Sequence, residues 1–101
     1  MNEIRNITPN QLKARLDKGE AVLMIDIRED EEVAAGMIPG AKHIVMGTIP
    51  ERLADIPKDQ EVILVCRSGS RSSHACAYLQ QVHGYDKIVN LTGGMLEWNQ
   101  L

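Results

Sequence analysis

The sequence lacks the features that mark several broad classes of protein. The 101-residue chain has two cysteines, too few for the disulfide framework of a small secreted domain. Its longest apolar runs, Ala21–Ile25 and Val62–Cys66, have five residues each, far fewer than the roughly 20 that a membrane-spanning helix needs. Eleven basic and 14 acidic residues give a net charge of −3, which predicts no broad positive surface for a nucleic-acid backbone.

Targeting signals and cofactor-binding motifs are also missing from the sequence. The first ten residues are polar and interrupted by Pro9, without the apolar run of a signal peptide, so we expect a cytoplasmic protein with free thiols. There is no G-x-G-x-x-G or Walker A motif. His43, His74 and His83 have no metal-ligand spacing with one another or with the cysteines. We therefore expect no cofactor, no metal, and no nucleic-acid or membrane partner.

The composition that remains is that of an ordinary globular domain. Hydrophobic residues make up 44% of the chain and charged residues 25%, which excludes disorder and collagen-like repeats. A chain of this length, without a linker or an internal repeat, predicts a single domain over residues 1–101. Because phenylalanine is absent, the core is expected to be aliphatic, with methionines filling gaps.

Apolar strand patterns alternate with helical patterns along the whole chain. Thr8, Pro9 and Gln11 predict a capping box at the start of a helix that stops at Gly19. The remaining helices are expected at 29–35, 49–56, 71–83 and 94–101, and strands at 21–27, 43–45, 61–65 and 87–91. This alternation predicts an α/β fold, with a mostly parallel sheet that is covered by helices on both faces.

Two of the predicted strands end in polar residues that could carry chemistry. Ligands of parallel sheets bind beyond the carboxyl ends of the strands. One strand ends in Asp26-Ile27-Arg28, and another ends in Cys66-Arg67-Ser68-Gly69-Ser70-Arg71, which leads directly into a helix. A loop of small residues at a helix start can turn its backbone N–H groups inward and bind an anion.

This loop favours a reactive thiolate at Cys66. The loop amides, the helix dipole and the arginines at 67 and 71 all favour the charged form, so the pKa of Cys66 should fall below its ordinary value of about 8.5. The simpler interpretation is that Cys66 is a small buried hydrophobic residue at a strand end. A core residue has no need of a glycine loop that carries two arginines, and we therefore favour the reactive cysteine.

Four segments, in the correct order, resemble the rhodanese-like sulfurtransferases. Cys66-Arg67-Ser68-Gly69-Ser70-Arg71 resembles the active-site loop of that family, C-R-x-G-x-R/T. The other three segments are Asp26-Ile27-Arg28-Glu29, Gly36-Met37-Ile38-Pro39-Gly40-Ala41, and Leu91-Thr92-Gly93-Gly94 followed by Trp98. The resemblance covers residues 3–99. It departs from the family at Met37, where histidine is common, in a turn that is distant in sequence from the reactive loop.

The resemblance implies a rhodanese-like fold, with a small five-stranded sheet, and a sulfurtransferase reaction. Cys66 would take the outer sulfur of thiosulfate or a similar donor, release sulfite and pass sulfur from its persulfide to cyanide or a thiol, which could belong to a protein. The amides of residues 67–71 would stabilise the thiolate and the persulfide, while Arg67 and Arg71 would attract the anionic donor. Arginine at 67, where the mercaptopyruvate branch has glycine, favours thiosulfate.

Several residues keep two interpretations. Asp26 is expected to support the loop amides or an arginine, because a carboxylate beside the sulfur would oppose the thiolate. Arg28 could reach the rim of the site or pair with an exposed acidic neighbour, Glu29 or Asp30, in the solvated acidic segment 29–32. Cys76 could resolve an oxidised Cys66, although an inert helix position is favoured.

His74 could assist proton transfer, but a surface position is favoured. Proteins of the same fold family carry out other activities. In phosphatases and arsenate reductases five residues separate the cysteine from the arginine, whereas four separate Cys66 from Arg71. A non-catalytic binding or regulatory module usually lacks the cysteine, which is present here. A sulfur carrier fed by another protein would need the same persulfide, and this alternative stays open.

Overall fold

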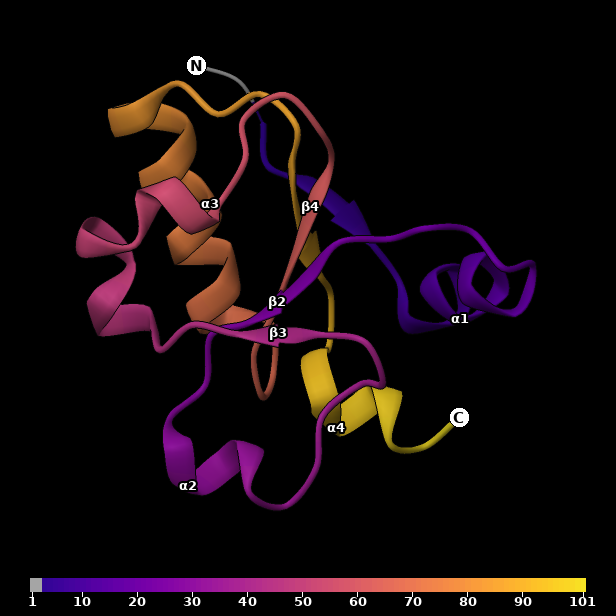
Figure 1. The fold of residues 1–101 in the computed structure, drawn as a ribbon. Helices are drawn as coiled ribbons and strands as arrows, with labels where there is room; N and C mark the ends of the chain where they lie inside the picture. Colours follow the sequence, from indigo (N-terminus) through magenta and orange to yellow (C-terminus); the bar gives the residue numbers. More distant parts are fainter. Residues whose placement is uncertain (1–2) are drawn as a thin grey trace.

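The computed structural model describes residues 3–101, and a five-stranded sheet forms the centre of the fold (Figure 1). The strands are β1 (Arg5–Ile7), β2 (Met24–Asp26), β3 (Lys42–His43), β4 (Val62–Val65) and β5 (Ile88–Leu91). Their order is β1-β5-β4-β2-β3, and every neighbouring pair is parallel. The carboxyl ends of all five strands therefore meet at one edge of the sheet, with β4 in the middle.

Helices cover both faces of this sheet. They are α1 (Pro9–Asp17), α2 (Asp30–Val33), α3 (Ser70–His83), α4 (Gly94–Trp98) and the 3-10 helices η1 (Met46–Glu51) and η2 (Leu53–Asp55). One core cluster joins the sheet to α3 and the 3-10 helices, and a second joins it to α1 and α4. In the described part of the chain, no helix is both long and apolar enough to cross a bilayer.

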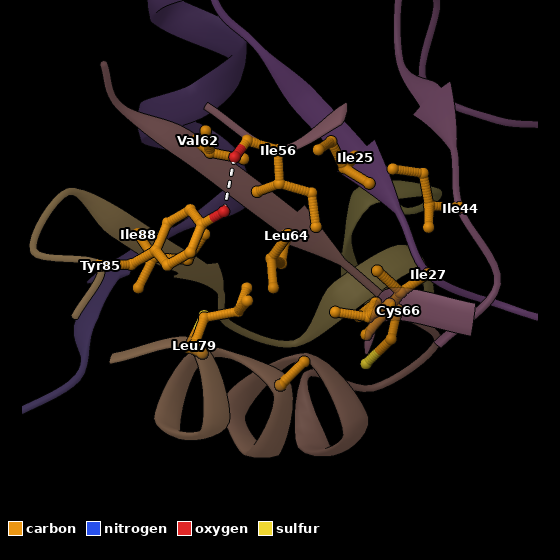
Figure 2. Packing of buried hydrophobic residues seen from close by; sticks show 13 residues of the cluster. Ile25, Ile27, Ile44, Ile56, Val62, Leu64, Cys66, Leu79, Tyr85 and Ile88 are labelled. Atoms are coloured by element: carbon orange, nitrogen blue, oxygen red, sulfur yellow. Dashed lines mark hydrogen bonds between the residues drawn. The ribbon is translucent and has the colours of Figure 1, made fainter. Parts of the chain in front are cut away.

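Alternate side chains of β4 belong to different core clusters. Ile63 and Val65 belong to the cluster beneath α1 and α4, whereas Val62, Leu64 and Cys66 belong to the cluster beneath α3 (Figure 2). Successive side chains of a strand point to opposite faces, so a continuous apolar run serves both cores at once. The same alternation fixes which face the cysteine takes.

The structure confirms the predicted fold class and the predicted start of the first helix. The Thr8 hydroxyl accepts a hydrogen bond from the Gln11 backbone N–H at 3.1 Å, and the Thr8 N–H donates to the Gln11 side chain at 2.9 Å. This reciprocal pair is the capping box that the sequence predicted, with Pro9 in the first turn.

Two expectations about the elements were wrong in detail. The polar residues of β1 were not predicted as a strand, yet β1 pairs with β5 at the sheet edge. The helix expected at 49–56 is instead η1 followed by η2. The helical segment begins at Met46, which makes Pro50 its fifth residue; Pro50 has no N–H to donate to the Met46 carbonyl, and this disfavours a continuous α-helix from Met46 onward.

Candidate active site at the end of the central strand

Cys66 lies at the carboxyl end of β4, directly before the turn that begins α3. Its side chain is fully buried on the α3 face of the sheet, and its sulfur points toward that helix (Figure 2). The residues that follow it, Arg67, Ser68 and Ser70, are exposed, so the sulfur lies beneath a short surface loop. Gly69, the residue before the first turn of α3, has a φ of +94°, a conformation that few other residues adopt.

The loop surrounds the Cys66 sulfur with hydrogen-bond donors. The backbone N–H groups of Gly69 and Ser72 lie 3.1 and 3.3 Å from the sulfur, and the Ser72 hydroxyl lies 3.2 Å from it. Burial acts to raise the pKa of the Cys66 thiol. Hydrogen bonds from the Ser72 side chain and from the backbone of Ser72, Gly69 and Ser68 outweigh burial, so this pKa lies below its ordinary value. The arrangement stabilises a thiolate.

Ser72 was not among the predicted site residues. The predicted loop ended at Arg71, but the N–H and the hydroxyl of the next residue both lie within 3.3 Å of the sulfur. A small hydroxyl residue in the first turn of the helix, directly after the loop, was the available signal.

The turn between β5 and α4 holds the reactive loop through backbone hydrogen bonds. The Met95 N–H donates to the Cys66 carbonyl and the Leu96 N–H donates to the Arg67 carbonyl, both at 2.9 Å. Gly94 precedes them and packs directly on the backbone of residues 66 and 67. The Gly-Gly segment therefore holds the reactive loop in place, although it carries no reactive group.

The two arginines of the loop have different surroundings. Both terminal nitrogens of Arg71 lie 2.8 Å from the carboxylate oxygens of Glu32, on α2. The expectation that the acidic segment 29–32 is only a solvated helix face was wrong at Glu32. Arg67 is exposed, and its side chain has no hydrogen bond or ion pair within residues 3–101. Of the two loop arginines, Arg67 is therefore the one that is free to bind an anion.

The ion pair between Glu32 and Arg71 predicts a pH-dependent stability. Hydrogen bonds from Arg71 and from the Glu29 backbone lower the pKa of Glu32 to about 2. Because this pKa is lower in the folded chain than in the unfolded one, the stabilisation is present above about pH 4.3 and is lost as the pH falls toward 2. We expect Glu32→Gln to lower the unfolding free energy at pH 7 by more than at pH 3, as urea titrations at both pH values would measure. An equal difference at both would contradict the pairing.

Asp26 and Arg28 form a closed, buried pair beside the loop. Asp26 is fully buried and accepts from the Arg28 backbone N–H at 3.0 Å and from its guanidinium at 2.8 to 3.1 Å. The guanidinium also donates to the Gly36 carbonyl at 2.7 Å. Of the two roles expected for Asp26, the structure places it on an arginine. Of the two interpretations of Arg28, the pairing with an exposed acidic neighbour was wrong, because its carboxylate partner is Asp26.

Cys76 and His74 both lie on α3 and make none of the hydrogen bonds that surround the Cys66 sulfur. Cys76 is fully buried on α3, and burial, followed by the charge of Cys66, raises the pKa of its thiol to about 12. It therefore remains protonated at neutral pH, which fits the inert position favoured from sequence. His74 is exposed on the first turns of the same helix. In residues 3–101, no cluster of histidine, cysteine and acidic side chains could hold a metal ion.

Two hollows flank the reactive loop. One, of about 550 Å³, has an almost entirely apolar lining between η1 and α3 that includes Met46, Ile49, Pro50 and Tyr78, and it reaches the loop at Arg71. The other, of about 220 Å³, is lined by the charged residues Arg28, Glu32 and Arg67 and by Met95, Leu96 and Asn99. The loop thus has an apolar hollow on one side and a hollow with charged residues on the other.

Comparisons with known proteins agree with this architecture. The family model described as "Rhodanese-like domain" matches residues 8–101. The "Sulfurtransferase" of Allochromatium vinosum is 47% identical over 95 residues, covering 94% of this chain and 88% of the relative. The "Thiosulfate sulfurtransferase GlpE" of Pseudomonas putida is 32% identical, covering 97% and 87%. The crystal structure of a rhodanese-like domain protein from Staphylococcus aureus is 41% identical, with a TM-score of 0.87 and coverage of 94% and 91%.

Proposed function

The chain belongs to the rhodanese-like domain family, with sulfurtransferases among its relatives, and we propose that it transfers sulfane sulfur from thiosulfate, through a persulfide on Cys66, to a thiol or to cyanide. The observation that carries this proposal is the pair of backbone N–H donors of Gly69 and Ser72, 3.1 and 3.3 Å from the Cys66 sulfur, together with the Ser72 hydroxyl 3.2 Å from it. We further propose that the protein works in the cytoplasm, where the thiol stays reduced.

In the first step the Cys66 thiolate attacks the outer sulfur of thiosulfate. A new S–S bond forms to Cys66, the bond to the sulfonate sulfur breaks, and its electron pair leaves with sulfite. Total charge is conserved, because the thiolate and the thiosulfate dianion become a persulfide anion and a sulfite dianion. The N–H groups of Ser68, Gly69 and Ser72 stabilise negative charge before and after this step.

In the second step the acceptor attacks the terminal sulfur of the persulfide. A thiolate acceptor becomes a persulfide and cyanide becomes thiocyanate, while the electron pair of the breaking S–S bond returns to Cys66 as a thiolate. Because the first product leaves before the acceptor reacts, the kinetics should be ping-pong. Initial rates at several fixed acceptor concentrations should give parallel double-reciprocal plots, and intersecting lines would contradict the persulfide route.

Arg67 is the residue that we propose recruits the donor. An exposed ionic contact contributes roughly 1 kcal/mol, so Arg67→Met should raise the KM for thiosulfate about fivefold and leave kcat nearly unchanged. Added salt should raise the KM of the native protein more than that of the variant. Arg52→Met is the matched control, because Arg52 is exposed and pairs with Asp55 outside both hollows next to the loop. An unchanged KM in Arg67→Met would remove this role.

The apolar hollow beside Arg71 favours a thiol acceptor over cyanide as the natural partner. The hollow has a volume of about 550 Å³, and its apolar lining can cover the carbon skeleton of a thiol or the apolar side chain next to a protein cysteine. The same surface supports the second candidate, a sulfur carrier loaded by another protein. Comparing loading rates with thiosulfate and with a protein persulfide separates the two, because a carrier would load at least tenfold faster from the protein.

A further inference from the structure

A chain of side-chain hydrogen bonds runs from the reactive sulfur across the sheet to its edge. The Ser72 hydroxyl, 3.2 Å from the Cys66 sulfur, donates to the Asn90 side-chain oxygen at 2.5 Å. The Asn90 amide nitrogen donates to the Asn6 side-chain oxygen at 3.1 Å, and the Asn6 amide nitrogen donates to the Ile4 carbonyl at 3.1 Å. These hydrogen bonds therefore link the end of β4 to α3, β5 and β1.

Asn90 is an unusual residue for its position in the sheet. It is 5% exposed in β5, between strands β1 and β4, whereas the other three residues of β5 are buried and apolar. A buried amide stabilises a fold only when its hydrogen bonds are satisfied, and an apolar side chain would fill the same strand position without that condition. Its partner toward the active site is Ser72, which is fully buried.

The direction of the hydrogen bonds limits what Ser72 can do for the sulfur. A carbonyl oxygen only accepts, so the Ile4 carbonyl orients the Asn6 amide, which in turn orients Asn90 with its oxygen toward Ser72. A hydroxyl carries a single hydrogen. While Cys66 is a thiol, its S–H can donate to Ser72 and every group is satisfied. Once Cys66 is a thiolate, the sulfur and Asn90 both require the one hydrogen of Ser72.

We propose that Asn90 is a positioning residue that competes with the Cys66 thiolate for the single hydroxyl hydrogen of Ser72, and thereby limits the acidity of the nucleophile. This inference rests on the proposed role of Cys66. The limit has a chemical use, because a thiolate becomes a weaker nucleophile as its pKa falls, and attack is fastest when the pKa lies near the ambient pH. The backbone N–H groups supply stabilisation that does not depend on this competition.

The other titratable groups near the sulfur stay the same in the variants that test this proposal. From α3 these are Arg71, held by Glu32, and the buried thiol of Cys76. At the end of β2, the buried Asp26–Arg28 pair lies beside β4, the strand that directly precedes Cys66. Exchanging Asn90 for leucine changes no charge, so a shift in the titration of Cys66 would report the hydrogen bond.

The test is the pH dependence of iodoacetamide alkylation at Cys66, followed by mass spectrometry. Asn90→Leu frees the Ser72 hydroxyl to donate to the sulfur. A hydrogen bond to a charged group is strong enough to lower the midpoint of the alkylation rate against pH by about one pH unit, which is a tenfold change in thiolate fraction on the acidic side. In Ser72→Ala, adding Asn90→Leu should change nothing. A midpoint that stays or rises in folded Asn90→Leu would overturn the proposal, as would the same downward shift without the serine.

A second, near-isosteric variant keeps the proposal testable if leucine prevents folding. Asn90→Asp retains an acceptor toward Ser72 and holds the hydroxyl more firmly, so the midpoint should rise by about one unit, and most of this rise should vanish in Ser72→Ala. A rise that persists without Ser72 would show a direct charge effect and contradict the proposal. The assay uses no sulfur donor. A protein that alkylates as expected but forms no persulfide refutes the proposed function alone.

Discussion

Cys66→Ser should lower the rate of sulfur transfer from thiosulfate at least about a thousandfold, because a serine hydroxyl stays protonated where the thiol ionises and forms no persulfide. The loss should appear in kcat, and the variant should fold, because serine is close to cysteine in size and keeps contact with the Gly69 and Ser72 amides. Thiocyanate formation with cyanide as acceptor measures the rate.

The second cysteine provides the matched control for this experiment. Cys76 is fully buried on the same helix that covers Cys66, and its thiol is protonated at neutral pH. Cys76→Ser should lower stability through the burial of a hydroxyl yet retain turnover within about twofold. Substantial turnover in Cys66→Ser would show that the persulfide is not on Cys66, and loss of turnover in well-folded Cys76→Ser would show that Cys76 is not inert.

Gly94→Ala should damage the site without touching any reactive atom. Gly94 has a φ of +54°, and a Cβ there would meet the Cys66 carbonyl oxygen and lie 2.6 Å from the Arg67 carbonyl group. The backbone must shift to relieve this overlap, and the strained conformation adds its own penalty, so we expect an unfolding free energy lower by about 3 kcal/mol. Because Met95 and Leu96 hold the loop carbonyls from this turn, turnover should fall about a hundredfold.

Gly19→Ala separates the effect on the loop from the backbone strain. Gly19 has a φ of +80°, and within residues 3–101 no atom outside Gly19 and its two chain neighbours lies within 4 Å of a Cβ built there. This variant should lose about 1 kcal/mol of stability through strain alone and keep its turnover. Urea unfolding and the thiocyanate assay on both variants give the comparison. Equal losses of turnover would contradict the role of the Gly94 turn, as would a fully active Gly94→Ala.

The sequence predicted those features of the fold that depend on neighbouring residues. Thr8 and Gln11 are three positions apart, so the capping box could be recognised before the helix was seen. The residues of the reactive loop are also consecutive in the sequence, so the cysteine, the loop amides and the arginines could be recognised together as one motif. Strand composition likewise located the buried strands β2, β4 and β5, although β2 is shorter than the apolar run around it.

The features that escaped prediction depend on contacts between distant residues. Glu32 and Arg71 are 39 positions apart, so the sequence could not show that the acidic helix start restrains a loop arginine. Asn6 and Asn90 are 84 positions apart and meet only because β1 and β5 are paired. A polar edge strand such as β1 has no periodic apolar signal, and its pairing follows from the finished sheet.

The central claim is that Cys66 carries a persulfide, and the most direct measurement is the intact mass after incubation with thiosulfate in the absence of reductant. The native chain and Cys76→Ser should each gain one sulfur atom and lose it again when cyanide is added, whereas Cys66→Ser should gain none. No gain in the native chain would exclude thiosulfate as the donor. A gain in Cys66→Ser that cyanide removes would place the persulfide on another residue and contradict the account.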